Sequence, residues 1–278
     1  MIPMNFSSKT ESADYLLSGT WSKKAISEGL KFSNINVVAS SEESNFTSAP
    51  DLDSWKLDSK ARYFHYAPNE TIQGVAIHSP PEIDSPIIAD MSSVILSEPL
   101  DVSKFSLIYA GAQKNIGPAG LTMVIIHKEM FEKENNNNSN IFKYSKHSEN
   151  NSMLNTPPTF AWYMAGKVFK WLKKEGGLEA MKKKNHLKAE TLYSYLDNSS
   201  FFSNPVKIEN RSIMNVPFIL DDKSLDSIFL EQAEERGLMN LKGHRSVGGM
   251  RASIYNAMPM EGVHDLIDFM KDFEKKNG

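Results

Sequence analysis

The sequence has no cysteine among its 278 residues, which excludes disulfide bonds, thiolate metal sites and cysteine nucleophiles. No apolar stretch approaches the roughly 20 residues of a membrane-spanning helix, and the polar N-terminus lacks the regions of a secretory signal. With a net charge of -3, the chain has no general attraction for nucleic acid or anionic membrane. These absences predict a cytoplasmic protein that binds neither.

Several common site motifs are also missing. The sequence has no Gly-x-Ser-x-Gly elbow, no phosphate-binding loop of the Gly-x-x-x-x-Gly-Lys type and no Gly-x-Gly-x-x-Gly dinucleotide turn. Six of the histidines show no spacing typical of metal ligands, and no metal site is predicted. They are His65, His78, His127, His147, His186 and His264.

Short apolar runs alternate with helical patterns over the first two thirds of the chain. Runs that are apolar on both faces are typical of buried strands in a sheet covered by helices. The alternation predicts an α/β domain with a mainly parallel sheet. The predicted strands are residues 35–39, 63–66, 86–91, 106–112 and 121–127.

The last third of the chain has a different pattern. Strands are predicted at residues 213–220 and 250–255, with an amphipathic helix between them and another near the C-terminus. We therefore expect a large α/β domain over residues 1–184 and a small α+β domain over residues 185–278. Two such domains usually leave a ligand cleft between them.

A lysine and an aspartate follow two neighbouring predicted strands. Lys114 lies in the glycine-rich segment of residues 106–120, SLIYAGAQKNIGPAG, where poor hydration favours the neutral amine that forms an imine. Asp90 ends the preceding strand, and the two side chains emerge at one rim if the strands share a sheet. Pyridoxal phosphate requires this pair, a lysine for its aldehyde and a carboxylate for its ring nitrogen. The alternatives are a solvated lysine and a turn or helix-capping aspartate.

A basic loop over residues 242–251, KGHRSVGGMR, is the third candidate. Glycines allow close backbone approach, and arginine pairs bidentately with carboxylate or phosphate. A solvated surface loop is the alternative. Two weaker candidates are Trp21, which could stack on a planar ring or belong to the core, and Thr71, which could offer a hydroxyl or belong to a capping turn.

Five segments together resemble the phosphoserine aminotransferases, which are class V aminotransferases of the fold type I group. The segments are HYAPNET at residues 65–71, ADMSS at 89–93, IYAGAQKNIGPAG at 108–120, NTPPTF at 155–160 and GHRSVGGMRAS at 243–253. The resemblance implies the fold type I architecture of pyridoxal 5'-phosphate enzymes, a cytoplasmic homodimer with shared active sites, and amino transfer between glutamate and 3-phosphohydroxypyruvate. It implies a place in serine and pyridoxine biosynthesis.

The resemblance also implies a role for each matched residue. Lys114 would bind the cofactor aldehyde and shuttle a proton, and Asp90 would pair with the ring nitrogen. The other implied contacts are Trp21 and Thr71 to the cofactor ring, Gln113 with Asn155 and Thr156 of the second subunit to its phosphate, Arg251 to the substrate carboxylate, and His244 and Arg245 to the substrate phosphate.

Family members carry a further N-terminal segment that this sequence does not match. By that comparison the chain resembles an N-terminally truncated subunit, and the alternative to an active aminotransferase is a catalytically impaired or inactive remnant. A third possibility is another fold type I enzyme such as a desulfurase. The lack of cysteine argues against a desulfurase, which needs a cysteine nucleophile.

Overall fold

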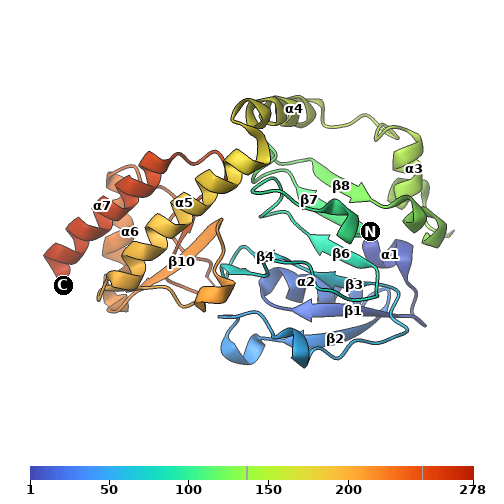
Figure 1. Ribbon diagram of the computed structural model, residues 1–278, viewed down its shortest axis with the longest axis horizontal. Coiled ribbons are helices and arrows are strands. Elements are labelled where there is room, and N and C mark those ends of the chain that lie inside the picture. Colours follow the sequence, from blue (N-terminus) through green and yellow to red (C-terminus); the bar gives the residue numbers. More distant parts are fainter. Residues whose placement is uncertain (136, 246) are drawn as a thin grey trace.

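The computed structural model describes residues 1–135, 137–245 and 247–278. A six-stranded sheet occupies one end of the molecule and a three-stranded sheet the other, with helix α5 (Gly177–Asn198) leading from the first to the second (Figure 1). Within the described residues, no helix is both long and apolar enough to cross a membrane.

The large sheet has the strand order β2-β1-β3-β6-β7-β8. All neighbouring strands run parallel except β7 and β8, which are antiparallel. The prediction of a mainly parallel sheet is confirmed, and each of the five predicted strands is present. The bounds are β1 Ser12–Leu17, β2 Asn34–Ser40, β3 Phe64–Tyr66, β6 Ile87–Asp90, β7 Leu107–Gly111 and β8 Thr122–Ile126.

Strand β1 is an element that the sequence analysis did not predict, although it lies between β2 and β3. Its apolar pattern is interrupted by Asp14, which is fully buried. The Asp14 carboxylate accepts hydrogen bonds from the Asn36 amide at 2.7 Å and from the backbone N–H of Asp58 at 3.0 Å. A buried carboxylate is tolerated when it is hydrogen-bonded in this way, and its partners come from distant parts of the chain.

The two faces of the large sheet carry separate cores. Tyr15, Ile88 and Leu107 belong to one core, while Leu16 and Ile108 belong to the other, as expected when successive side chains alternate. The first core lies under α1 (Ile2–Phe6), α2 (Thr20–Gly29) and α3 (Tyr144–Glu149), and the second under α4 (Thr159–Lys174).

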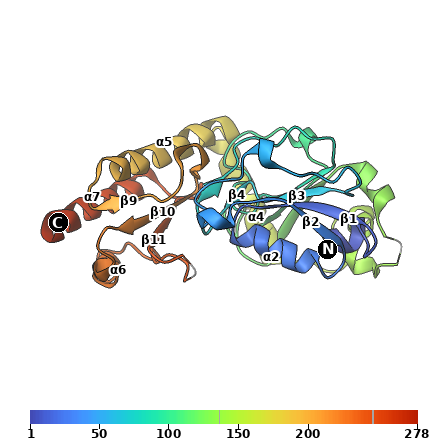
Figure 2. The same ribbon diagram turned by 90° about the horizontal axis from the view of Figure 1, so that it is seen from below.

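The small sheet consists of β9 (Phe202–Ser203), β10 (Asn215–Leu220) and β11 (Met250–Ser253). Figure 2 shows α5 and α7 (Met260–Asn277) together on one side of β10 and β11. Helix α6 (Asp226–Glu235) joins this core through Phe229, whose ring contacts Phe218 on β10 and Phe273 on α7. These aromatic contacts give the α+β part a hydrophobic core of its own.

The remaining elements are short. Strands β4 (Asn69–Glu70) and β5 (Val75–Ala76) form a separate two-stranded sheet. The 3-10 helices are Glu42–Ser44, Leu52–Ser54, Val102–Lys104, Lys128–Lys133, Asn140–Phe142, Ile208–Asn210 and Lys223–Leu225. The expected domain boundary, between residues 184 and 185, falls inside α5, and the division at that point stays a prediction.

Three buried asparagines join the two sheets. The Asn256 backbone N–H donates to the side-chain oxygen of Asn115 at 3.0 Å. The Asn185 amide on α5 donates to the Asn256 side chain at 2.8 Å and to the Ser97 carbonyl at 2.9 Å. Because Asn115 directly follows Lys114, the junction also anchors the turn that carries this lysine.

Lys188, also on α5, is only 3% exposed. Its ammonium group donates to the backbone carbonyls of Ile254 at 3.0 Å, Tyr255 at 2.8 Å and Met258 at 3.1 Å. These carbonyls belong to the connection between β11 and α7. Lys188 therefore fastens α5 to the chain that leaves β11.

We expect Lys188→Met to reduce the free energy of unfolding by about 2–4 kcal/mol, because three carbonyls lose a charged donor. Urea unfolding measures the change. The control is Lys184→Met on the same helix, where the lysine forms an exposed ion pair with Glu175 and its loss should cost less than about 1 kcal/mol. Equal losses in the two variants would contradict the fastening role of Lys188.

Candidate active site

The candidate site lies at the carboxyl edge of the large sheet. Asp90 is the last residue of β6, and Lys114 lies in the turn that follows β7. Asp90 pairs in register with Tyr109, so the neighbouring strands end at the same edge. Ligands of open α/β sheets bind outside this edge.

Lys114 is largely withdrawn from water. Its ammonium nitrogen donates to the Thr71 hydroxyl at 2.7 Å and lies 5.8 Å from the ring centre of Trp21. Burial lowers the pKa of Lys114 from 10.5 to about 8, while the nearby charge of Asp90 acts in the opposite direction and that of Arg251 adds to the lowering. A neutral amine is thus accessible at mildly alkaline pH.

Asp90 makes the turn contacts that the sequence offered as one alternative, and its role toward a cofactor stays a prediction. One of its oxygens accepts hydrogen bonds from the Ser92 backbone N–H at 3.0 Å and the Ser92 hydroxyl at 2.6 Å, as in a turn. The Ser92 hydroxyl oxygen accepts in turn from the Gly111 N–H at 3.0 Å. The turn after β6 is thereby tied to the end of β7, while the charge of Asp90 still acts on Lys114.

Trp21 lies in the first turn of α2 and is 39% exposed, so it does not belong to the core. Its position depends on Glu70, a fully buried residue that the sequence analysis did not single out. The Glu70 carboxylate accepts from the backbone N–H groups of Trp21 and Ser22, each at 2.8 Å. A side chain at Gly19 would lie within 2.5 Å of Glu70, so glycine is required there.

Arg251 belongs to β11 in the small sheet, and its charge reaches Lys114 across the junction. Its buried Nε atom has no hydrogen-bond partner among the described residues. His244 and Arg245 lie in the loop before β11, where Arg245 is exposed. Residue 246, within the predicted basic loop, lies outside the described residues. The fold therefore brings Arg251 close enough to Lys114 for its charge to act there. His244 and Arg245 lie on the loop that leads into the strand of Arg251.

The remaining predicted residues lie on exposed segments. Gln113 is exposed, and its amide packs over Gly111, where an added Cβ would lie 2.5 Å from the Gln113 side chain. Asn155 and Thr156 are exposed in the segment before α4. In the described part of this single chain, neither side chain makes a hydrogen bond, so their predicted contact with a second subunit remains a prediction.

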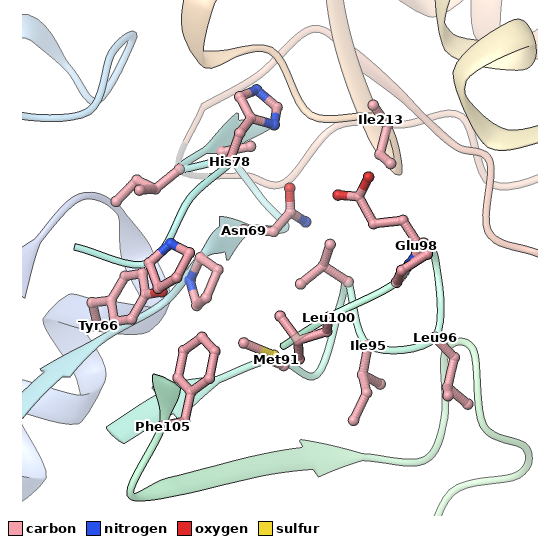
Figure 3. A pocket seen from close by; sticks show the side chains of 16 residues that line it. Tyr66, Asn69, His78, Met91, Ile95, Leu96, Glu98, Leu100, Phe105 and Ile213 are labelled. Atoms are coloured by element: carbon pink, nitrogen blue, oxygen red, sulfur yellow. The ribbon is translucent and has the colours of Figure 1, made fainter. Parts of the chain in front are cut away.

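A cavity of about 410 Å³ opens beside Lys114. Its walls combine the turn after β7, helix α4 and the domain junction, and they include Lys167, Trp171 and Asn256. A smaller cavity of about 90 Å³, shown in Figure 3, is mainly apolar, with His78 and Glu98 among its few ionisable residues. The second cavity contains neither Lys114 nor Asp90, so it is separate from the candidate site.

Metal ligation is not supported by the arrangement. Among the residues that the structure describes, no group of three or more histidine or acidic side chains is placed to hold a metal ion.

Comparison with known proteins identifies the family of the chain. The family model for class V aminotransferases matches residues 2–266. Phosphoserine aminotransferase from Hahella chejuensis is 52% identical over 277 residues, which cover 99% of this chain and 77% of the relative. The chain belongs to the phosphoserine aminotransferase family. The relative from Acinetobacter baylyi is 51% identical, again with 77% of its length covered.

Solved structures of phosphoserine aminotransferases share the fold. The enzyme from Bacillus circulans subsp. alkalophilus superposes with a TM-score of 0.97 at 42% identity, covering all of this chain and 77% of that one. The pyridoxal-phosphate-bound enzyme from Trichomonas vaginalis gives 0.92 at 43% identity, covering 97% and 78%. The predicted fold type I architecture is confirmed by these likenesses.

We expect Glu70→Ala to reduce the free energy of unfolding by about 2–3 kcal/mol, because two buried N–H groups at the start of α2 lose their acceptor. Urea unfolding measures the loss, and the exposed Glu43→Ala serves as the control. The affinity for pyridoxal phosphate should fall as well, since Trp21 loses its anchored position. Unchanged stability in Glu70→Ala would refute this anchoring.

Proposed function

We propose that the chain transfers the amino group of glutamate to 3-phosphohydroxypyruvate, giving 2-oxoglutarate and O-phosphoserine, with pyridoxal 5'-phosphate as cofactor. The observation that carries this proposal is the pairing of a half-buried Lys114 with Asp90 at the carboxyl edge of the sheet. The related phosphorylated substrate of pyridoxine synthesis belongs to the same proposal. When bound, the cofactor supplies an electron sink for the carbanion that forms at the substrate α-carbon.

The residues at the edge fit the cofactor. The lowered pKa of Lys114, about 8, supplies an amine that can attack its aldehyde. Asp90 offers a carboxylate for the ring nitrogen, Thr71 a hydroxyl already within reach of Lys114, and Trp21 a half-exposed ring for stacking. Gln113 directly precedes Lys114 in the same turn, where its amide suits the cofactor phosphate.

Lys114 has a second task in this proposal. Its free amine would take the proton that leaves the substrate α-carbon and pass it on, while the cofactor would supply the electron sink. A pKa close to the operating pH suits an amine that must both accept and donate a proton. Burial, the largest cause of the lowered pKa, thus serves both the binding and the proton transfer.

Substrate recognition falls to the small sheet. The Nε atom of Arg251 is buried without a hydrogen-bond partner among the described residues, and a substrate carboxylate would supply the missing acceptor. His244 and Arg245, on the loop before β11, are proposed to bind the substrate phosphate. A dianionic substrate also accounts for a cluster of cationic side chains on a chain with a net charge of -3.

We propose a homodimer in which Asn155 and Thr156 reach the cofactor phosphate of the partner chain. Both are exposed, and Phe160 and Tyr163, which follow at the start of α4, are 71% and 60% exposed. Large aromatic side chains exposed next to polar ones are typical of a subunit interface.

The direct test is the visible absorption of the purified chain after addition of pyridoxal phosphate and then glutamate. We expect a band of the bound cofactor that glutamate removes and 3-phosphohydroxypyruvate restores, with pyruvate much less effective. Lys114→Ala is the control and should give no such band. A spectrum equal to that of free cofactor would favour the alternative of an inactive remnant.

The same experiment has a defined pH dependence. Because only the neutral amine attacks the aldehyde, the rate of cofactor capture should rise with pH up to about 8 and then level off. An amine with the ordinary value of 10.5 would keep the rate rising through that region. A profile without a plateau would contradict the burial of Lys114.

Mixed dimers test the shared site. Lys114→Ala and the double variant Asn155→Ala, Thr156→Ala should each be inactive or strongly impaired alone. After unfolding and refolding together, mixed dimers regain one intact site, and we expect about a quarter of wild-type activity. Activity no higher than the sum of the separate variants would show that each chain builds its own site.

A further inference from the structure

Three stacked aromatic side chains, Tyr15 and His65 buried and Tyr109 partly buried, lie side by side on strands of the large sheet near Asp90. His65, on β3, is 2% exposed and stacks on Tyr15 of β1, with ring centres 4.7 Å apart. On its other side it stacks on Tyr109 of β7 at 5.9 Å. The β6 strand, which ends at Asp90, runs between β3 and β7. His65 and Tyr109 therefore reach toward each other over the strand that carries Asp90.

A hydrogen bond and a charge connect these side chains. The Nε2 atom of His65 lies 3.0 Å from the Tyr109 hydroxyl oxygen. Tyr109 pairs in register with Asp90 on the neighbouring strand, and after burial the charge of Asp90 is the main cause that raises the pKa of Tyr109 well above 10. Tyr109 is thus neutral, bonds to His65 and is acted on by the charge of Asp90.

The direction of the protons follows from the groups themselves. An ionised carboxylate only accepts, so in a hydrogen bond between the two groups Tyr109 donates its single O–H to Asp90. The Tyr109 oxygen then accepts from His65, which requires a proton on Nε2. Burial lowers the pKa of His65 to about 4, so the ring is neutral and its Nδ1 carries no proton. Nδ1 is indeed buried without a hydrogen-bond partner among the described residues.

We propose that Tyr109 and His65 are positioning residues for the cofactor, forming a donor chain from His65 Nε2–H through the Tyr109 hydroxyl to the Asp90 carboxylate. In this arrangement the Asp90 carboxylate has the Tyr109 hydroxyl as a donor in addition to the backbone N–H and hydroxyl of Ser92. This inference rests on the proposed pairing of Asp90 with the ring nitrogen.

The donor chain has a consequence for the bound cofactor. Each donor to a carboxylate stabilises its negative charge and weakens its hold on a further proton. With Tyr109 in place, the proton shared between Asp90 and the ring nitrogen stays on the nitrogen, where it strengthens the electron sink. Without that donor, the proton moves toward Asp90 and the cofactor is bound less tightly.

The first test uses the chain without cofactor. In protein labelled with ¹⁵N-histidine, the two ring-nitrogen shifts of His65 report its tautomer, and the signal is assigned by its loss in His65→Phe. We expect the neutral ring with the proton on Nε2 between pH 6 and 8, well above its pKa of about 4. A proton on Nδ1 of His65, or a charged imidazole ring, would contradict the proposed donor chain.

The second test follows the ring nitrogen of ¹⁵N-labelled pyridoxal phosphate bound to each variant. In Tyr109→Phe, its shift should move toward that of an unprotonated pyridine, and the dissociation constant of the cofactor should rise about tenfold. Tyr63→Phe is the control, because it also removes a tyrosine hydroxyl from this region, and that hydroxyl lies 2.9 Å from the Tyr15 hydroxyl and does not act on Asp90. Equal effects in both variants would reduce Tyr109 to a packing role.

A double substitution tests whether His65 acts through Tyr109. His65→Phe keeps a stacked ring but removes the donor, and its effect on the ¹⁵N shift should disappear in the Tyr109→Phe background. Additive effects of the two substitutions on the ¹⁵N shift would contradict the proposed donor chain. Asp90→Asn separates the two levels of the argument: if it leaves the ¹⁵N shift unchanged, the proposed role of Asp90 fails. If only Asp90→Asn moves the shift, Asp90 keeps its role and the donor chain fails.

Discussion

Parallel pairing of β6 with β7 is the constraint on which the candidate site depends. It brings the carboxyl ends of both strands to one edge, and the Ser92 hydroxyl fixes the two ends to each other by bonding both Asp90 and Gly111. Lys114 follows Gly111 by three residues and therefore has little freedom to leave that edge. An antiparallel partner would have placed the turn after β7 at the opposite end of the sheet from Asp90.

The domain junction and the site share their anchors. Asn115 directly follows Lys114 and is held by the Ile95 carbonyl at 2.9 Å and by the backbone of Asn256 at 3.0 Å. Asn256 lies just beyond β11, the strand that carries Arg251. Any shift of the small sheet would therefore displace both the lysine turn and the arginine. Buried hydrogen bonds of this kind specify one relative position more strictly than apolar packing does.

Much of the fold could be predicted from the sequence, and the element that was missed has a physical explanation. Apolar runs revealed β2, β3, β6, β7 and β8 because strands buried on both faces need no polar positions. Strand β1 escaped because Asp14 interrupts its pattern, and the Asn36 and Asp58 groups that satisfy this carboxylate become its neighbours only after folding.

The site divides in the same way. The positions of Lys114 and Asp90 at one edge of the sheet could be predicted because strand ends and parallel pairing follow from local sequence. Glu70 was missed because the helix that it caps begins far back in the chain, at Thr20. Tyr109 and His65 looked like ordinary core residues, since nothing in their spacing shows that both reach over β6 toward Asp90.

The five arginines of this acidic chain divide into two groups. Three form ion pairs: Arg62 with Glu11, Arg211 with Asp197 and Arg236 with Asp272. The other two, Arg245 and Arg251, have no carboxylate partner within the described residues. A buried guanidinium nitrogen without a hydrogen-bond partner lowers the stability of the fold. Such a nitrogen is tolerated at a site where a ligand supplies the missing acceptor. The unpaired arginines flank the same loop in the small sheet, and one of them acts electrostatically on Lys114. Their lack of carboxylate partners within the described residues agrees with the anionic substrate proposed above.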